Sequence, residues 1–266
     1  MSAIDRIEFC GVEGLRVGRF NLGLTTTCIV YRIGNTLIDA GPPNQWRVVR
    51  EFVKEREVGR LLITHHHEDH SGNAARIQQQ TEARLLMHHD GVDRLAHGFP
   101  LRLYQRVFWG RPEHCTPEAV EGQIEPAGGT RLQLIHTPGH SADSTCYLAP
   151  DEGWLFTGDL YIARKTRYLR QDENLKEYIR SLRQVLESDF DTVFCAHRGV
   201  VPSGRQALRD KLDYLVELRA RVRRLHAEGR SVAEITRMLF GREDFLSWTT
   251  WFHFSKKNLI AGCLEE

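Results

Sequence analysis

The stretch Thr64-His65-His66-His67-Glu68-Asp69-His70 says most about fold and chemistry in this 266-residue chain. It continues directly from residues 60–64 (RLLIT), a compact apolar run that predicts a short buried strand. Alternate residues of an extended segment share a face, so we expect His65, His67 and Asp69 to point the same way. These three side chains would then meet at the carboxyl end of one strand.

His70 is out of phase with those three side chains. A turn that opens the next helix would return it to the same cavity, and Gly72 permits such a turn at little steric cost. His66 should face away from the cavity, because it alternates with the aligned residues. Imidazole and carboxylate groups together suit zinc, iron or manganese. Burying four such groups within six residues is costly without a cation or water to satisfy them, so the run predicts a metal site.

Three later segments also place a metal-ligand side chain just after an apolar run. They are His140 in HTPGH, Asp159 in LFTGD and His197 in VFCAH. A single histidine in such a place is more often structural than a ligand. Four candidate ligand segments, each at the end of a predicted strand, together favour one composite metal site.

The order HxHxDH, TPGH, GD and a last histidine resembles the metallo-β-lactamase superfamily, over roughly residues 1–200. The resemblance implies an α/β fold, an αββα sandwich of two mixed sheets with outer helices. It also implies a glyoxalase II-like site with two divalent metal ions, for which zinc is favoured and iron or manganese are alternatives. His67 stands where flavodiiron proteins typically have Glu, which argues against an oxygen-reducing diiron role.

The resemblance divides the predicted ligands into two sets and a bridge. They are His65, His67 and His140 for one ion, Asp69, His70 and His197 for the second, and Asp159 between them. Asp39, in LIDAG, matches a position that supports the ligands from behind. The last ligand lies in AHRG where many members have GHG, which puts Arg198 beside the site.

The expected mechanism is metal-dependent hydrolysis of a small ester or thioester. Two cations about 3.5–4 Å apart share a water and lower its pKa from about 15.7 towards about 7. One ion also stabilises the charge that develops on the substrate's carbonyl oxygen. Asp69 would orient the hydroxide and move its proton. The predicted catalytic set is Asp69, His65, His67, His140, Asp159 and His197.

Three other functions stay open on the sequence alone. The same metals would serve an RNA or phosphodiester hydrolase, and one iron would serve a persulfide dioxygenase. Some members of the superfamily act chiefly by binding or regulation and keep a residual esterase site. The basic residues of 205–224 are interrupted by acidic ones, which favours a solvated helix face over an RNA surface. A formal net charge of +1 gives no global attraction to nucleic acid.

The sequence predicts a catalytic domain over residues 1–204 and a helical region over 205–266. Residues 98–120 are expected to form an irregular, aromatic insertion over the site. Its part 99–109 and the cluster Trp248, Trp251, Phe252 and Phe254 are candidates for the pocket wall or for a dimer or domain contact. Tyr161 is expected to face either the cavity or the core, and Lys256 or Lys257 to touch an anionic group.

The cellular setting is also an expectation at this point. No apolar run reaches the ~18–20 residues that a membrane span needs. The first residues lack the pattern of a secretory signal. The six cysteines form no CxxC pair, which is typical of free thiols in the cytoplasm. The expected partner is a small-molecule substrate, and a homodimer stays open.

Overall fold

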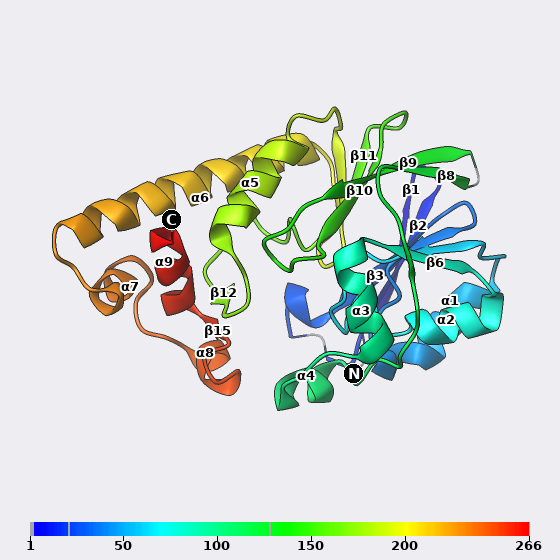
Figure 1. Ribbon diagram of the computed structural model, residues 1–266, viewed down its shortest axis with the longest axis horizontal. Coiled ribbons are helices and arrows are strands. Elements are labelled where there is room, and N and C mark those ends of the chain that lie inside the picture. Colours follow the sequence, from blue (N-terminus) through cyan, green and yellow to red (C-terminus); the bar gives the residue numbers. More distant parts are fainter. Residues whose placement is uncertain (1–2, 21, 128, 266) are drawn as a thin grey trace. The chain divides into compact units, whose positions relative to one another are not determined.

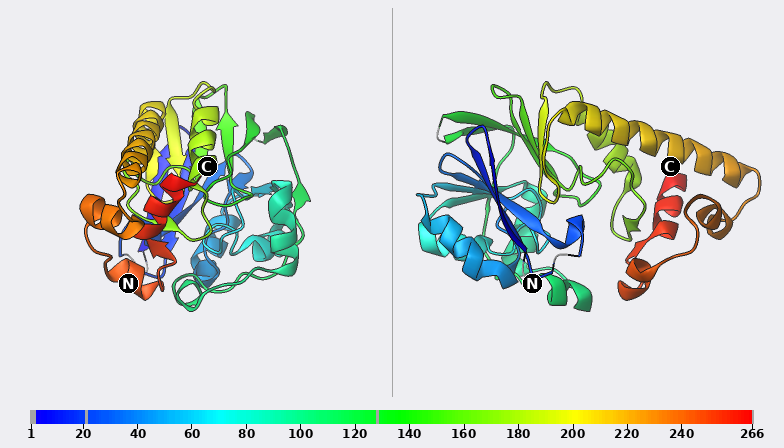
Figure 2. Two further views of the ribbon diagram at one scale, coloured as in Figure 1. Left: turned by 60° about the vertical axis from the view of Figure 1, so that its left-hand side comes forward. Right: turned by 180° about the vertical axis from the view of Figure 1, so that it is seen from behind.

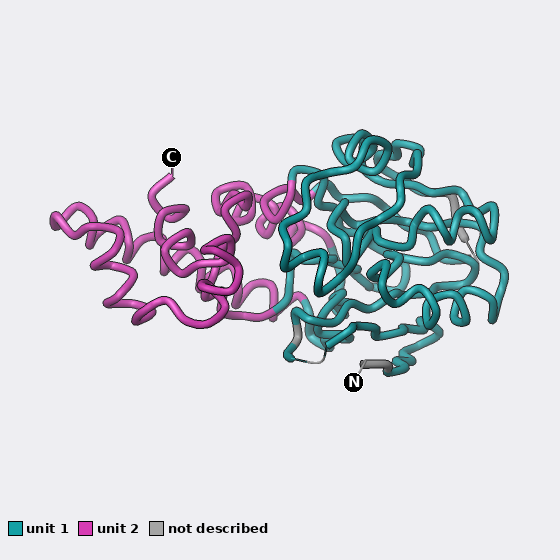
Figure 3. Tube along the Cα trace, turned by 90° about the horizontal axis from the view of Figure 1, so that it is seen from below, with its two compact units in different colours: residues 1–136, 142–162, 189–204 teal, residues 137–141, 163–188, 205–266 magenta. Residues whose placement is uncertain are grey.

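The computed structural model describes residues 3–20, 22–127 and 129–265. They divide into two compact units (Figure 3). The sheet unit comprises Met1–His136, Ala142–Ile162 and Asp189–Gly204, and the helical unit comprises Thr137–Ser141, Ala163–Ser188 and Arg205–Glu266. The functional boundary expected between residues 204 and 205 stays a prediction.

The first sheet of the sheet unit runs in the order β1 to β7, which is also the order of the chain. Its strands are β1 (Ala3–Phe9), β2 (Val12–Gly18), β3 (Cys28–Ile33), β4 (Thr36–Ile38), β5 (Arg60–Leu62), β6 (Arg84–Met87) and β7 (Glu118–Ala119). The strands pair antiparallel from β1 to β4 and parallel from β4 to β7. A tight turn at Gly34 and Asn35 joins β3 to β4.

The parallel half of this sheet needs helical crossovers, since parallel strands cannot be joined by a tight turn. They are α1 (Trp46–Lys54), which follows η2 (Pro43–Gln45), and α2 (Ala74–Thr81). With α3 (His89–His97) they cover one face of the sheet (Figure 1). Their apolar sides pack on that face, where Phe52 and Ile77 join Leu37 and Leu61 in one core cluster.

The second sheet runs in the order β14-β13-β11-β10-β9-β8. Its strands are β8 (Gln123–Ala127), β9 (Thr130–His136), β10 (Thr145–Ala149), β11 (Trp154–Gly158), β13 (Thr192–Cys195) and β14 (Gly199–Val201). Only the β11–β13 pair is parallel in the described sheet. Tyr31 and Leu62 of the first sheet share a core cluster with Tyr147, Phe156 and Phe194 of the second.

That shared core packs the two sheets face to face within the sheet unit. The long β1–β2 hairpin at one end of the first sheet is shown in dark blue in Figure 2. Both sheets are mixed, as predicted. The short elements η1 (Leu24–Thr26) and α4 (Leu103–Phe108) lie in the loops. The α4 helix falls in the insertion that was expected to be irregular, so that part of the prediction is wrong.

The helical unit is built around α5 (Leu175–Val185) and the long α6 (Gly204–Ala227). It continues with α7 (Val232–Phe240), α8 (Phe245–Thr249) and α9 (Lys256–Leu264), and β12 (Leu169–Arg170) pairs with β15 (Phe254–Ser255). The predicted helical C-terminal region is therefore confirmed. No helix in the described ranges is both long and apolar enough to cross a membrane.

Candidate metal centre

The backbone of the motif after β5 turns before His70, as predicted from the sequence. Residues 64–70 are all buried, from 0% exposure at His70 to 9% at Asp69. The backbone N–H of His70 donates to His67 O at 3.0 Å, and that of Ser71 donates to the same oxygen at 2.9 Å. These bonds close a turn, and the turn brings His70 back towards the residues that precede it.

The sheet unit brings together the ligands predicted for the second ion. One ligand atom from each of Asp69, His70 and His197 lies within 4.8 Å of the other two. The same holds for His65, His70 and Asp159. Asp159 Oδ1 lies 3.0 Å from His197 Nε2 and 3.3 Å from His70 Nε2.

His65 and His67 face each other as the alternation predicts. Their ring centroids are 4.5 Å apart, and His70 lies 4.1 Å from His65 on the same measure. Thr64 Oγ1 lies 3.1 Å from His65 Nδ1. The imidazoles of the motif therefore form one buried cluster at the end of β5.

Asp39 holds the motif from behind. Its Oδ2 lies 2.7 Å from His70 Nδ1, and its Oδ1 accepts the backbone N–H of Thr64 at 2.8 Å. Asp39 has a φ of 63°, in the left-handed region where Asp is better tolerated than most residues. The strained backbone places its carboxylate under the motif, and the bond to Nδ1 leaves His70 Nε2 facing Asp159.

His197 is fixed in the same manner by a backbone carbonyl. Its Nδ1 lies 2.5 Å from Thr27 O, and Arg16 Nη1 donates to His197 O. Burial alone would lower the pKa of His197, but the adjacent carboxylate of Asp159 outweighs it, so the pKa is raised above the ordinary value. The cluster therefore attracts positive charge.

His140 belongs to the helical unit, where it has its own supporting carboxylate. Its Nδ1 lies 2.5 Å from Glu173 Oε1, and Glu173 Oε2 accepts the backbone N–H of Arg170 at 2.9 Å. Glu173 was not predicted from the sequence. Nothing in the linear sequence marks it, because 33 residues separate it from His140.

The donor set fits divalent metal ions. His70, His197 and His140 each have Nδ1 held by a carboxylate or a carbonyl, the arrangement that orients metal-bound imidazoles through Nε2. The buried Nε2 of His70 makes no hydrogen bond to any described residue. A buried imidazole nitrogen of this kind, among other imidazoles and carboxylates, suits zinc, iron or manganese.

His66 points into a different contact, as its phase predicted. Asp143, which is fully buried, accepts the His66 backbone N–H at 2.7 Å, and its other oxygen lies 2.8 Å from His66 Nδ1. Ser71 Oγ donates to His66 O at 2.7 Å. The contact between His66 and Asp143 therefore anchors the motif. This role of Asp143 was not predicted from the sequence.

Replacing Asp143 with alanine is expected to lower the free energy of unfolding by about 3 kcal/mol, because two buried donors of His66 lose a charged acceptor. Asp143→Asn keeps one acceptor oxygen and should recover part of the loss. Urea unfolding measures both, with Asp151→Ala as the control because Asp151 is exposed and pairs with Arg131. A loss below about 1 kcal/mol for Asp143→Ala would show that the contact does not anchor the motif.

The remaining predicted residues lie as follows. Glu68, inside the motif, accepts a hydrogen bond from Gln105 Nε2 of α4 at 2.9 Å, so the insertion is tied to the motif. Tyr161 is buried, with 6% exposure. Lys256 is also buried and lies 3.0 Å from Asp244 Oδ2, so its charge is already used inside the helical unit.

The aromatic cluster and the basic helix belong to the helical unit. Trp248 and Trp251 expose 65% and 62% of their surface, and their role in a pocket wall stays a prediction. Arginines of α6 donate to carbonyls within the unit, Arg205 to Leu186 O and Arg223 to Cys263 O. Some arginines of the predicted basic face therefore bind backbone carbonyls of the helical unit.

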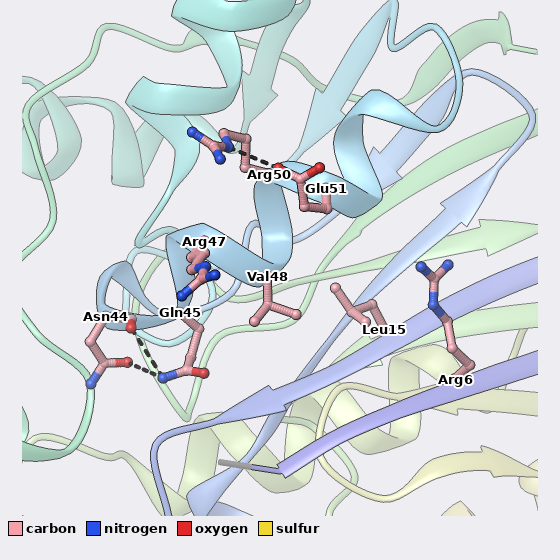
Figure 4. Close-up of a pocket in the computed structure, with 8 residues that line it drawn as sticks. All are labelled: Arg6, Leu15, Asn44, Gln45, Arg47, Val48, Arg50 and Glu51. Carbon is pink, nitrogen blue, oxygen red and sulfur yellow. Dashed lines mark hydrogen bonds and ion pairs between the residues drawn. The ribbon is translucent and has the colours of Figure 1, made fainter.

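A cavity of about 710 Å³ lies against α1 (Figure 4). Leu15 of β2 and Val48 of α1 line it together with Arg6, Arg47 and Arg50. None of its lining residues is a predicted ligand. The cavity is therefore distinct from the predicted ligand set.

Comparison with known proteins agrees with this fold. A family model described as the metallo-beta-lactamase superfamily matches residues 24–197, more than half of the chain. The chain belongs to the metallo-β-lactamase superfamily. A beta-lactamase domain protein from Burkholderia ambifaria has the same fold, with a TM-score of 0.74 over 98% of this chain and 88% of that one at 20% identity.

Curated relatives are longer than this chain. The lactamase-like protein aptB of Emericella nidulans is 29% identical over 196 residues, which cover 72% of this chain and 55% of the relative. An atrochrysone carboxyl ACP thioesterase of Aspergillus fumigatus is 28% identical over 182 residues, which cover 66% of this chain and 51% of the relative. The chain thus spans about half the length of the curated relatives that it matches.

Proposed function

We propose that this chain is a metal-dependent hydrolase that cleaves small acyl thioesters or esters. The observation that carries the proposal is the convergence of Asp69, His70 and His197 on one point, with Asp159 facing two of them. Relatives named thioesterases favour the thioester over other acyl substrates. The proposed agent is a pair of divalent ions, with zinc first and iron or manganese as alternatives.

The ligand assignment predicted from the sequence is kept as part of this proposal. Asp69, His70 and His197 would hold one ion, and Asp159 would bridge to the second. His65, His67 and His140 would hold that second ion. Bound divalent ions supply a hydroxide at neutral pH and polarise the substrate's carbonyl.

Asp69 is the residue proposed to move the proton. It is the most exposed carboxylate of the motif, and its Oδ2 lies 3.6 Å from His197 Nε2 and 3.8 Å from His70 Nε2. In the reaction the water oxygen bonds to the carbonyl carbon and the carbon–sulfur bond breaks. Asp69 takes the proton from water and returns it to the departing thiolate, so the acid and the free thiol are the products.

Metal removal tests the proposal. Protein dialysed against a chelator is expected to lose thioester hydrolysis and to regain it with about two equivalents of zinc, iron or manganese, measured by elemental analysis and thiol release. His70→Ala should not regain it, whereas the exposed His226→Ala should behave as wild type. Full hydrolysis by the stripped protein would overturn the proposal.

The same substrate panel separates the other functions named from the sequence. Cleavage of single-stranded RNA that is lost in His70→Ala would replace the thioesterase proposal with a phosphodiesterase. One iron with oxygen consumption on a persulfide would replace it with a dioxygenase. A protein with bound metal but only weak turnover of every compound would point to a regulatory member.

A further inference from the structure

Arg198 is held at three points in the turn between β13 and β14. Its backbone N–H donates to Cys195 Sγ at 3.1 Å, and its carbonyl accepts from Arg16 Nη2 at 3.1 Å. Its side-chain Nε donates to Ile162 O at 2.8 Å. The first two contacts fix the backbone of the turn, and the third orients the guanidinium in advance.

The outer edge of that guanidinium faces no carboxylate. Its two terminal nitrogens make no hydrogen bond or ion pair to any residue in the described ranges, and the residue is exposed. Some other arginines of the sheet unit are paired with acids, as the exposed Arg84 is with Glu118 and the half-buried Arg76 with Glu113. Arg198 is therefore an oriented cation whose forked donor edge is open to solvent.

The position of Arg198 ties it to the metal cluster. It follows His197 directly, and the carbonyl that it binds belongs to Ile162, three residues after Asp159. Both neighbouring ligands send their side chains into the cluster, where His197 Nε2 and Asp159 Oδ1 are 3.0 Å apart. Arg198 itself is no part of the cluster, so it would meet a part of the substrate away from the reacting carbonyl.

We infer that Arg198 selects substrates that carry an anionic group, a carboxylate or a phosphate, on the acyl part or on the leaving thiol. The inference rests on the proposed function and narrows its substrate class. The planar fork of arginine binds such oxyanions through two parallel hydrogen bonds. With Nε bound to Ile162 O, the two terminal NH2 groups are the donors left for that purpose.

Three thioesters with the same type of scissile bond test the inference. They are the N-acetylcysteamine thioester of acetate, which is neutral, that of succinate, which is anionic on the acyl side, and acetyl-coenzyme A, which is anionic on the thiol side. Arg198→Gln is expected to raise KM for one of the anionic compounds roughly 10- to 100-fold and to leave the neutral one unchanged. Arg198→Lys keeps the charge without the fork and should fall in between.

Arg47→Gln is the matched control, since Arg47 is exposed on α1 and lines the separate cavity of Figure 4. A raised KM for the succinyl thioester alone would place the recognised anion on the acyl part of the substrate. A raised KM for acetyl-coenzyme A alone would place it on the thiol. Equal KM values for wild type and Arg198→Gln on all three compounds would overturn the inference, as would an equal rise on all three.

A binding measurement keeps this test separate from the proposed function. Calorimetric titration of the metal-loaded protein with succinate, coenzyme A and neutral N-acetylcysteamine needs no turnover. Weaker binding of one anion to Arg198→Gln supports the anion site even if no thioester is hydrolysed, in which case only the proposed reaction fails. Unchanged binding of both anions overturns the site even if hydrolysis is found.

Discussion

Asp159→Ala is expected to lower thioester hydrolysis by at least about 1,000-fold and to reduce the bound metal below two equivalents. The reason is the position of its Oδ1, which faces His197 Nε2 at 3.0 Å and His70 Nε2 at 3.3 Å. Alanine removes a donor shared by both proposed ions, so neither would keep its full set. Thiol release and elemental analysis on the same preparation measure the two effects.

Asp151→Ala is the control for this variant, because it removes an exposed aspartate from the same unit. It should leave both hydrolysis and metal content at the wild-type level. Asp159→Asn keeps one carbonyl oxygen and should retain more metal than the alanine variant. If Asp159→Ala kept more than about a tenth of wild-type hydrolysis, the bridging role would be wrong.

Much of this site could be predicted from local sequence because its ligands follow strands. Alternation within the run after β5 was enough to align His65 with His67, and their rings lie 4.5 Å apart. The out-of-phase His70 required a turn, and the bonds to His67 O provide it. Asp159 and His197 were predictable for a related reason, since β11 and β13 are parallel neighbours whose ends meet.

The supporting contacts were beyond the reach of such reasoning. Asp143 lies 77 residues from the His66 that it anchors, and Glu173 lies 33 residues from His140. Both pairings depend on tertiary packing, which leaves no periodic signal in the sequence. The short helix α4, of six residues, was missed because less than two turns shows no readable apolar period.

Gly72 was predicted to permit the turn after the motif at little steric cost, but the structure gives a different reason for a glycine at this position. It is absent from the glycines with positive φ, so no left-handed turn requires it. The requirement is space, because a Cβ at this position would lie 2.3 Å from Glu68 O, 2.3 Å from Pro43 Cδ and 2.7 Å from Gly41 O. Two of these contacts are with carbonyl oxygens, which no change of side-chain rotamer can move aside.

Hydrogen bonds also join the two segments that meet at Gly72, residues 40–42 and 70–73. The backbone N–H of Ala40 donates to His70 O at 2.6 Å, and Asn73 Nδ2 lies 2.8 to 3.1 Å from the carbonyl oxygens of Ala40, Gly41 and Pro42. A Cβ would have to push this loop away from the motif. The same movement would displace Asp39, which precedes the loop and holds His70 Nδ1.

Gly72→Ala is therefore expected to lower the free energy of unfolding by about 3 kcal/mol or more, the upper range for an overpacked interior. It should also weaken metal binding, because His70 loses its fixed orientation. Gly59→Ala is the matched control, since its φ is not positive and its close contact is with the flexible side chain of Asn35 at 2.9 Å. Urea unfolding with and without chelator measures both effects, and a Gly72→Ala protein within about 1 kcal/mol of wild type would show that the loop yields to the new methyl group.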